Sequence, residues 1–314
     1  MEVIRQDTKF KFMARRHIFL MLSVVAMLTS AVLLATKGLN YGIDFRGGIE
    51  LRYQFKNEVN MAVIRSILES KGWGSAIVQK TQGTQIHEYL VSFRLENEGS
   101  SQKPADITSA LQTAFPNEQI ELRKVDSVGP RVGADLKKAA VLSMVYTMLI
   151  ILAYVWFRFN IIFSPPAVLA LFHDVLITMG VLVVLRAEFD LSVVAALLTI
   201  VGYSLNDTIV VFDRVRDNLI HQGKLSLEHV LDRSINETLS RTILTSLTTF
   251  NVCVILILMG GPTLYPFALT MATGVVVGTY SSVYIASPIA LWIDHWLSQR
   301  KERKLKPAHA TQPR

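Results

Sequence analysis

Six long apolar stretches constrain the fold of this chain more than any other feature. They cover about residues 17–36, 138–158, 161–185, 189–213, 241–260 and 265–296. A helix needs roughly 20 apolar residues to cross a bilayer, and each stretch is about that long or longer. With 51% hydrophobic and only 18% charged residues, the composition agrees with this reading. The sequence predicts an α-helical membrane protein with six spans.

The net charge of +7 is concentrated beside the membrane rather than on a nucleic-acid-binding face. Cytoplasmic segments next to spans carry excess Lys and Arg. We therefore predict a cytoplasmic basic N-terminus (1–16), an uncleaved first span, and a cytoplasmic basic tail (297–314). The basic residues of these two ends are Arg5, Lys9, Lys11, Arg15 and Arg16, and Arg300, Lys301, Arg303, Lys304 and Lys306.

Residues 37–137 are polar and turn-rich, and they contain no apolar run of membrane length. They predict a soluble domain on the far side of the membrane, named here the outer domain. Its patterning gives the order βαββαβ, which is the ferredoxin-like or split βαβ arrangement. The expected elements are strand 49–55, helix 60–71, strand 76–81, strand 88–95, helix 105–115 and strand 119–127.

An enzyme is not expected from this sequence. Cys253 is the single cysteine and lies in an apolar stretch, and His87 is isolated. We find no metal-ligand cluster, nucleotide-binding loop or nucleophile triad. The sequence therefore predicts no cofactor and no metal.

The fourth apolar stretch ends in the polar motif Gly202–Arg214, which contains Asp207. An acid at the centre of a membrane helix costs about 2.5–3.5 kcal/mol on insertion scales, and such acids usually mark ion pathways. Asp207 is accordingly a candidate functional carboxylate. The alternative is an interfacial, solvated position, since Asp213 lies only roughly 9 Å further along the helix. Ser204, Asn206, Thr208 and Asp213 are candidate supporting polar residues.

Arg241 opens the fifth stretch, and a row of hydroxyl side chains follows it. The fourth and fifth spans run antiparallel, so Asp207 and Arg241 are predicted at similar depth. An ion pair would relieve the desolvation of both groups. The alternative is that Arg241 is only a basic flank of its span. The hydroxyl residues are Thr242, Thr245, Ser246, Thr248 and Thr249.

Three further features belong to the helical part. His173 and Asp174 lie near the middle of the third span, either as a polar pair that holds helices together or with a role in ion movement. Residues 214–240 form a cytoplasmic loop with an amphipathic helix that Ser226 caps. Gly274 and Gly278 form a GxxxG pattern, which indicates close helix packing.

Three motifs in order make the chain resemble the SecF members of the SecD/SecF protein-export family. The motifs are Gly42-Ile43-Asp44-Phe45-Arg46-Gly47-Gly48, Val125-Asp126-Ser127-Val128-Gly129-Pro130 and Asn206-Asp207-Thr208-Ile209-Val210-Val211-Phe212-Asp213-Arg214. The resemblance covers nearly the whole chain. It implies an RND-like six-span half-unit with a ferredoxin-like extracytoplasmic domain, in the bacterial inner membrane, with both termini cytoplasmic.

The resemblance also implies partners and a role. The expected partners are SecD, the SecY-E-G channel, YajC, a translocating preprotein and protons, with no nucleic acid. The implied role is to use the proton-motive force in late steps of preprotein export, with Asp207 and Arg241 linked to proton movement. Gly42, Asp44, Phe45, Gly47 and Gly48 are the family-motif residues near the membrane. Two alternatives stay open: half of an RND-type exporter of small molecules or lipids, and a non-transporting scaffold of the translocase.

Overall fold

The computed structural model describes residues 8–74, 76–80, 87–93, 104–159, 162–221 and 225–305. Several predicted features fall outside these ranges. They are Arg5, the strand ends at Thr81 and Leu95, and the tail from Lys306 onward.

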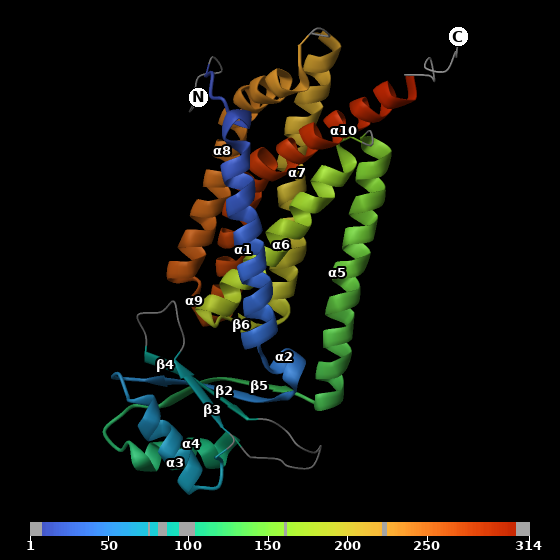
Figure 1. The fold of residues 1–314 in the computed structure, drawn as a ribbon. Coiled ribbons are helices and arrows are strands. Elements are labelled where there is room, and N and C mark those ends of the chain that lie inside the picture. The colour runs from blue at the N-terminus through green and yellow to red at the C-terminus, as the bar shows by residue number, and fades with distance from the viewer. Residues whose placement is uncertain are drawn as a thin grey trace, which may run out of the picture.

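Long helices form a bundle, and a small mixed domain hangs from one end of it (Figure 1). Within the described residues, six helical segments are long and apolar enough to cross a membrane, as predicted. The end of the bundle away from the outer domain holds the start of α1, the end of α7, the start of α8 and the end of α10 (Figure 1). The helices are α1 (Arg16–Lys37, after the 3-10 turn Met13–Arg15), α5 (Pro130–Arg158), α6 (Ser164–Leu185), α7 (Leu191–His221), α8 (Leu227–Met259), α9 (Gly261–Ser281), the π-helical segment η2 (Ser282–Ala286) and α10 (Ser287–Leu305).

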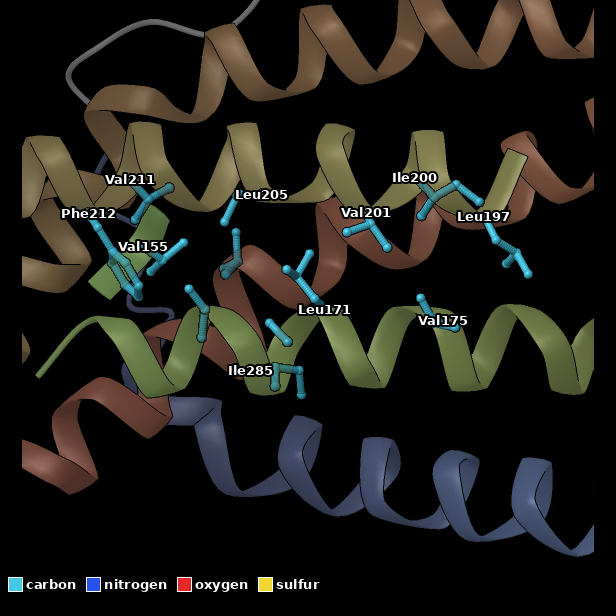
Figure 2. Packing of buried hydrophobic residues seen from close by; sticks show 14 of the residues in the cluster. Val155, Leu171, Val175, Leu197, Ile200, Val201, Leu205, Val211, Phe212 and Ile285 are labelled. Atoms are coloured by element: carbon cyan, nitrogen blue, oxygen red, sulfur yellow. The ribbon is translucent and has the colours of Figure 1, made fainter. Parts of the chain in front are cut away.

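Helix α7 lies at the centre of the bundle core. Its buried side chains include Leu197, Ile200 and Val201 (Figure 2), and Ile200 lies against Gly274 of α9. Leu171 of α6 and Ile285 of η2 belong to the same buried cluster. Apolar burial on several sides is what places a polar residue of α7 out of contact with water.

Helices α7 and α8 extend beyond the spans expected from the apolar stretches. Helix α7 continues to His221, and α8 is one helix from Leu227, so the amphipathic segment and the fifth span are continuous. No Gly or Pro interrupts 227–259. The N-terminal segment also holds this extension, since the backbone N–H of Met13 donates to Asp232 at 2.9 Å and Arg16 pairs with Glu228 at 3.0 Å.

The outer domain has the predicted element order. Its four-stranded sheet has the strand order β3-β4-β2-β5 with every neighbouring pair antiparallel, which is the split βαβ arrangement. The apolar faces of α3 and α4, including Ile64, Leu68, Ile107 and Leu111, are buried in the domain's own core. The elements are β2 (Gly48–Phe55), α3 (Met61–Ser70), β3 (Ile77–Lys80), β4 (His87–Phe93), α4 (Pro104–Ala114) and β5 (Glu121–Val128).

A junction made of β1 (Asn40–Tyr41), α2 (Ile43–Arg46) and β6 (Glu188–Phe189) joins the outer domain to the bundle. Strands β1 and β6 pair in parallel. The expected glycine turn follows α2 directly, with Gly47 at φ 71°. A Cβ on Gly47 would lie 2.8 Å from the backbone of Pro130, so this glycine lets α5 start against the junction.

Glu188 is a half-buried carboxyl at this junction. Its pKa is raised to about 8, mainly by burial and then by the carboxylates of Glu50 and Asp190, while Arg52 and Arg46 oppose the rise. Its Oε1 also lies only 2.8 Å from the position that a Cβ on Gly42 would take. At the junction, the protonated form of Glu188 is therefore favoured over the ionised form.

Replacing Gly274 by alanine should destabilise the bundle. The new Cβ would lie 2.2 Å from Cδ1 of Ile200 on α7, so the two helices must separate. Overpacking of this kind costs about 1–3 kcal/mol. Denaturant unfolding in detergent measures the loss. Gly202→Ala is the matched control, because nothing lies within 4 Å of its Cβ position; equal loss in both variants would contradict close α7–α9 packing.

Glu188 should make the fold less stable as pH rises. Its carboxyl has an ordinary pKa of 4.5 and a folded pKa of about 8, so stability is greatest below about 4.5 and declines up to about 8. Glu188→Gln should remove about 1–2 kcal/mol of this decline, less than the full shift because water reaches the side chain. Thermal unfolding across this range, with exposed Glu69→Gln as the control, tests it; an unchanged pH profile in Glu188→Gln would refute the assignment.

Candidate functional site

Asp207 lies inside the bundle rather than in the interface. It is 3% exposed on α7. Its Oδ2 faces the hydroxyl of Ser246 on α8 at 3.5 Å, and Ser246 is hydrogen-bonded to Thr279 of α9 at 2.6 Å. One hydroxyl contact of this length offsets little of the free energy lost when a carboxylate is removed from water. The ionised form is thus held weakly, and the neutral form suits this position.

Arg241 does not form an ion pair with Asp207 within 4.0 Å in the described part of the chain. Its side chain is exposed, and it nevertheless acts electrostatically on Asp207. Ser246, five residues further along α8, takes the contact position instead. The two residues are neighbours on α7 and α8, with the guanidinium at the edge and the carboxyl inside.

The other polar residues near Asp207 have different partners from those expected. Ser204 donates to Asp174 on α6, and Thr208 donates to the backbone carbonyl of Ser204. Asn206 is exposed. Asp213 pairs with Arg158 of α5 at 2.8 Å near the helix end. Helical spacing explains this for Asn206, Thr208 and Asp213, which point to other faces of α7 than Asp207. Ser204 lies one turn before Asp207 and bonds α6 instead.

His173 and Asp174 form a second buried polar cluster, and both are 1% exposed. Nδ1 of His173 lies 2.9 Å from Oδ1 of Asp174. Oδ2 of Asp174 accepts from Ser204 of α7 and from Ser281 of α9, the latter at 2.8 Å. The cluster thus joins three helices, which agrees with the expected role of a polar pair that holds helices together.

The glycine motif near the membrane contacts the start of α7. Oδ2 of Asp44 accepts from the backbone N–H of Leu191 at 3.0 Å, so Asp44 caps the helix that carries Asp207. Phe45 packs on Phe189, with ring centroids 5.7 Å apart. The N–H of Gly42 donates to the carbonyl of Phe189 at 2.9 Å. Gly47 and Gly48 follow in the turn into β2. Asp207 is about 24 Å along α7 from this cap.

Several residues near the two buried acids and at the junction were not predicted as site residues from the sequence. Thr279, Tyr280 and Ser281 interrupt the sixth apolar stretch, and that polar run was the available signal. No local sequence pattern around Glu188 indicates that its carboxyl group is buried. Among the described residues, no group of three or more His, Cys, Asp or Glu side chains is placed to hold a metal ion.

Comparisons with known proteins agree with these features. Residues 107–296 match the family described as "Protein export membrane protein SecD/SecF, C-terminal", and residues 32–59 match the "SecD/SecF GG Motif". The second match contains the junction glycines, and the first contains Asp207 and the His173–Asp174 cluster.

Relatives and solved structures match over most of the chain. Protein translocase subunit SecF of Calditerrivibrio nitroreducens is 38% identical over 93% of this chain and 97% of its own. That of Vibrio alginolyticus is 40% identical, covering 92% and 91%. The crystal structure of SecDF, a translocon-associated membrane protein from Thermus thermophilus, has a TM-score of 0.82 and 35% identity, with 93% of this chain but 39% of that one covered. With two family matches and curated relatives at this level of identity, the chain belongs to the SecD/SecF family of protein-export membrane proteins.

Proposed function

We propose that this protein is an accessory subunit of the Sec translocase that works with a SecD partner and uses the proton-motive force in late steps of preprotein export. The translocase role is supported by relatives named as SecF subunits. A SecD partner is supported by solved SecDF chains, of which this chain covers about two-fifths. The SecY-E-G channel, YajC and the preprotein are further proposed partners, and the bacterial inner membrane is the proposed location.

The observation that carries the proposal is a buried carboxylate at one point of α7 and the outer-domain contact at its start. Asp207 is weakly held in its ionised form, and Asp44 of the glycine motif caps the same helix. A change in the charge of Asp207 changes the free energy of its contacts with α8, and with it the favoured position of α7. A shift of α7 would then move the junction and the outer domain attached to it.

The energy is sufficient for such a change. One proton crossing 100 mV releases about 2.3 kcal/mol, roughly a 50-fold change in a two-state population. Arg241 contributes as a positive charge at the edge that attracts the ionised carboxylate, while protonation removes the attraction. The proposed orientation places the termini and the α7–α8 turn in the cytoplasm and the outer domain outside.

Asp207→Asn should abolish the part of export that depends on the proton-motive force, while the protein stays folded and bound to its partner. The amide keeps the shape of the side chain but cannot exchange a proton. We expect a loss of roughly tenfold or more at normal expression level, measured as preprotein export in cells or vesicles. Asp217→Asn, an exposed carboxylate on the same helix, is the matched control and should export normally. Export by Asp207→Asn at the control level would refute the relay and favour a scaffold.

A further inference from the structure

We propose that His173 and Asp174 form a second proton-binding site, distinct from Asp207 and coupled to it. The inference deepens the proposed function, since it adds a site to the same proton-dependent machine. It rests on the geometry of the buried cluster, on one ring nitrogen that has no hydrogen-bond partner among the described residues, and on hydroxyl side chains that adjoin the two carboxyl groups.

The hydrogen bonds of Asp174 indicate a carboxylate rather than a carboxylic acid. Its two oxygens receive His173 Nδ1 and the hydroxyls of Ser204 and Ser281. A carboxylate only accepts, and three donors pointing at one carboxyl group satisfy the ionised form. His173 must then carry a hydrogen on Nδ1 to donate.

That assignment leaves Nε2 of His173 as the open position. In a neutral ring with a hydrogen on Nδ1, Nε2 is a bare acceptor. Nε2 is buried and has no hydrogen-bond partner among the residues that the structure describes. Buried polar atoms are nearly always paired, so an unpaired one indicates a role other than static packing.

Charge explains why this nitrogen would take a proton. With a neutral imidazole, the pair carries one uncompensated negative charge in the membrane interior. A proton added at Nε2 converts His173 to imidazolium, and the pair becomes neutral overall. Tyr280 stacks on the ring, with centroids 6.1 Å apart and planes at 22°, and an aromatic face attracts the cation.

Short connections link this site to Asp207. Ser204 bonds Asp174 and lies three residues before Asp207 on α7. On the other side, Ser246 contacts Asp207 and Thr279, and Thr279 is two residues before Ser281, which bonds Asp174. Since the two carboxyl groups share these neighbours, a change of charge at one affects proton binding at the other.

The π-helical segment η2 begins immediately after Ser281. Single π turns inside helices occur frequently at functional sites. A change in the side-chain hydrogen bonds of Ser281 would therefore act next to a helical turn whose backbone hydrogen bonds are already not α-helical.

Several elements that pack against α6 carry other titratable groups. Asp207 of α7, Tyr280 of α9 and Tyr284 of η2 are the ones nearest in sequence to the cluster's partners. The remaining ones with described side chains are Arg16, His17 and Lys37 on α1, Arg131, Asp135, Lys137, Lys138, Tyr146, Tyr154 and Arg158 on α5, Tyr203, Asp213, Arg214, Arg216, Asp217 and His221 on α7, Tyr265 on α9, and Asp294, His295 and Arg300 on α10. None of these forms an ion pair with His173 or Asp174 in the described part of the chain.

The test is the protonation of His173 in the full-length protein with nitrogen-15-labelled imidazoles, followed by NMR from about pH 5 to 9, where histidine changes charge. His173→Gln identifies the signal. We expect His173 to be neutral with hydrogen on Nδ1 at high pH and to take one proton at Nε2 as pH falls. A ring with hydrogen fixed on Nε2, or one that does not titrate, would overturn the proposal.

Two conservative variants test the coupling with opposite signs. At a pH where Asp207 is ionised, Asp207→Asn removes a nearby negative charge and should lower the protonated fraction of His173. Ser281→Ala removes a donor from Asp174, concentrates its charge and should raise that fraction; its selective effect also identifies the signal if His173→Gln does not fold. Asp217→Asn is the control and should change nothing. A purely structural pair predicts no shift in either variant, and that result would overturn the proposal.

The NMR result and the export result are separable. If Asp207→Asn exports normally but shifts His173, the proton site stands and the proposed energy coupling fails. If Asp207→Asn stops export and leaves His173 unmoved, the proposed function stands and the second site is refuted.

Discussion

The close approach of α9 to α7 is the contact on which the polar interior depends. Gly274 lies against Ile200, and a Cβ on Gly278 would be 3.0 Å from Cβ of Ser204. Helix α9 also contacts α8 through Thr279 and Ser246 and α6 through Ser281 and Asp174, so displacing α9 from α7 would disturb both contacts. Hydroxyl contacts of under 3 Å between helices require backbones this close, and small residues allow it in membranes.

Helix α7 connects features that lie far apart in the structure. Its first turn is capped by Asp44 from the glycine motif, its middle carries Ser204 and Asp207, and its last turns leave the apolar region. A rigid helix transmits displacement along its axis. In the proposed function, the junction at β1, α2 and β6 passes a change of charge inside the bundle on to the outer domain as a movement. Glu188, whose pKa is raised by burial, makes the junction itself responsive to pH.

The sequence predicted the interior acid and its neighbours in α8, but not the geometry between them. Asp207 is buried as expected, while the guanidinium of Arg241 stays at the exposed edge and Ser246 makes the contact. Depth along two antiparallel helices follows from residue counting. Rotation of each helix about its axis does not, and that rotation decides which of two residues on α8 faces Asp207.

Hydrophobic periodicity and length were sufficient to predict six spans, a βαββαβ domain and the order of the elements, because local patterning sets element type and the bilayer sets span length. Pairings across the chain had no such local signal. The cap of α7 by Asp44, the cluster of Asp174 with Ser204 and Ser281, and the burial of Glu188 each join segments separated by at least 30 positions in sequence. They arise only when the packed helices bring those side chains together, since the free energy of a buried polar group depends on the partners that surround it.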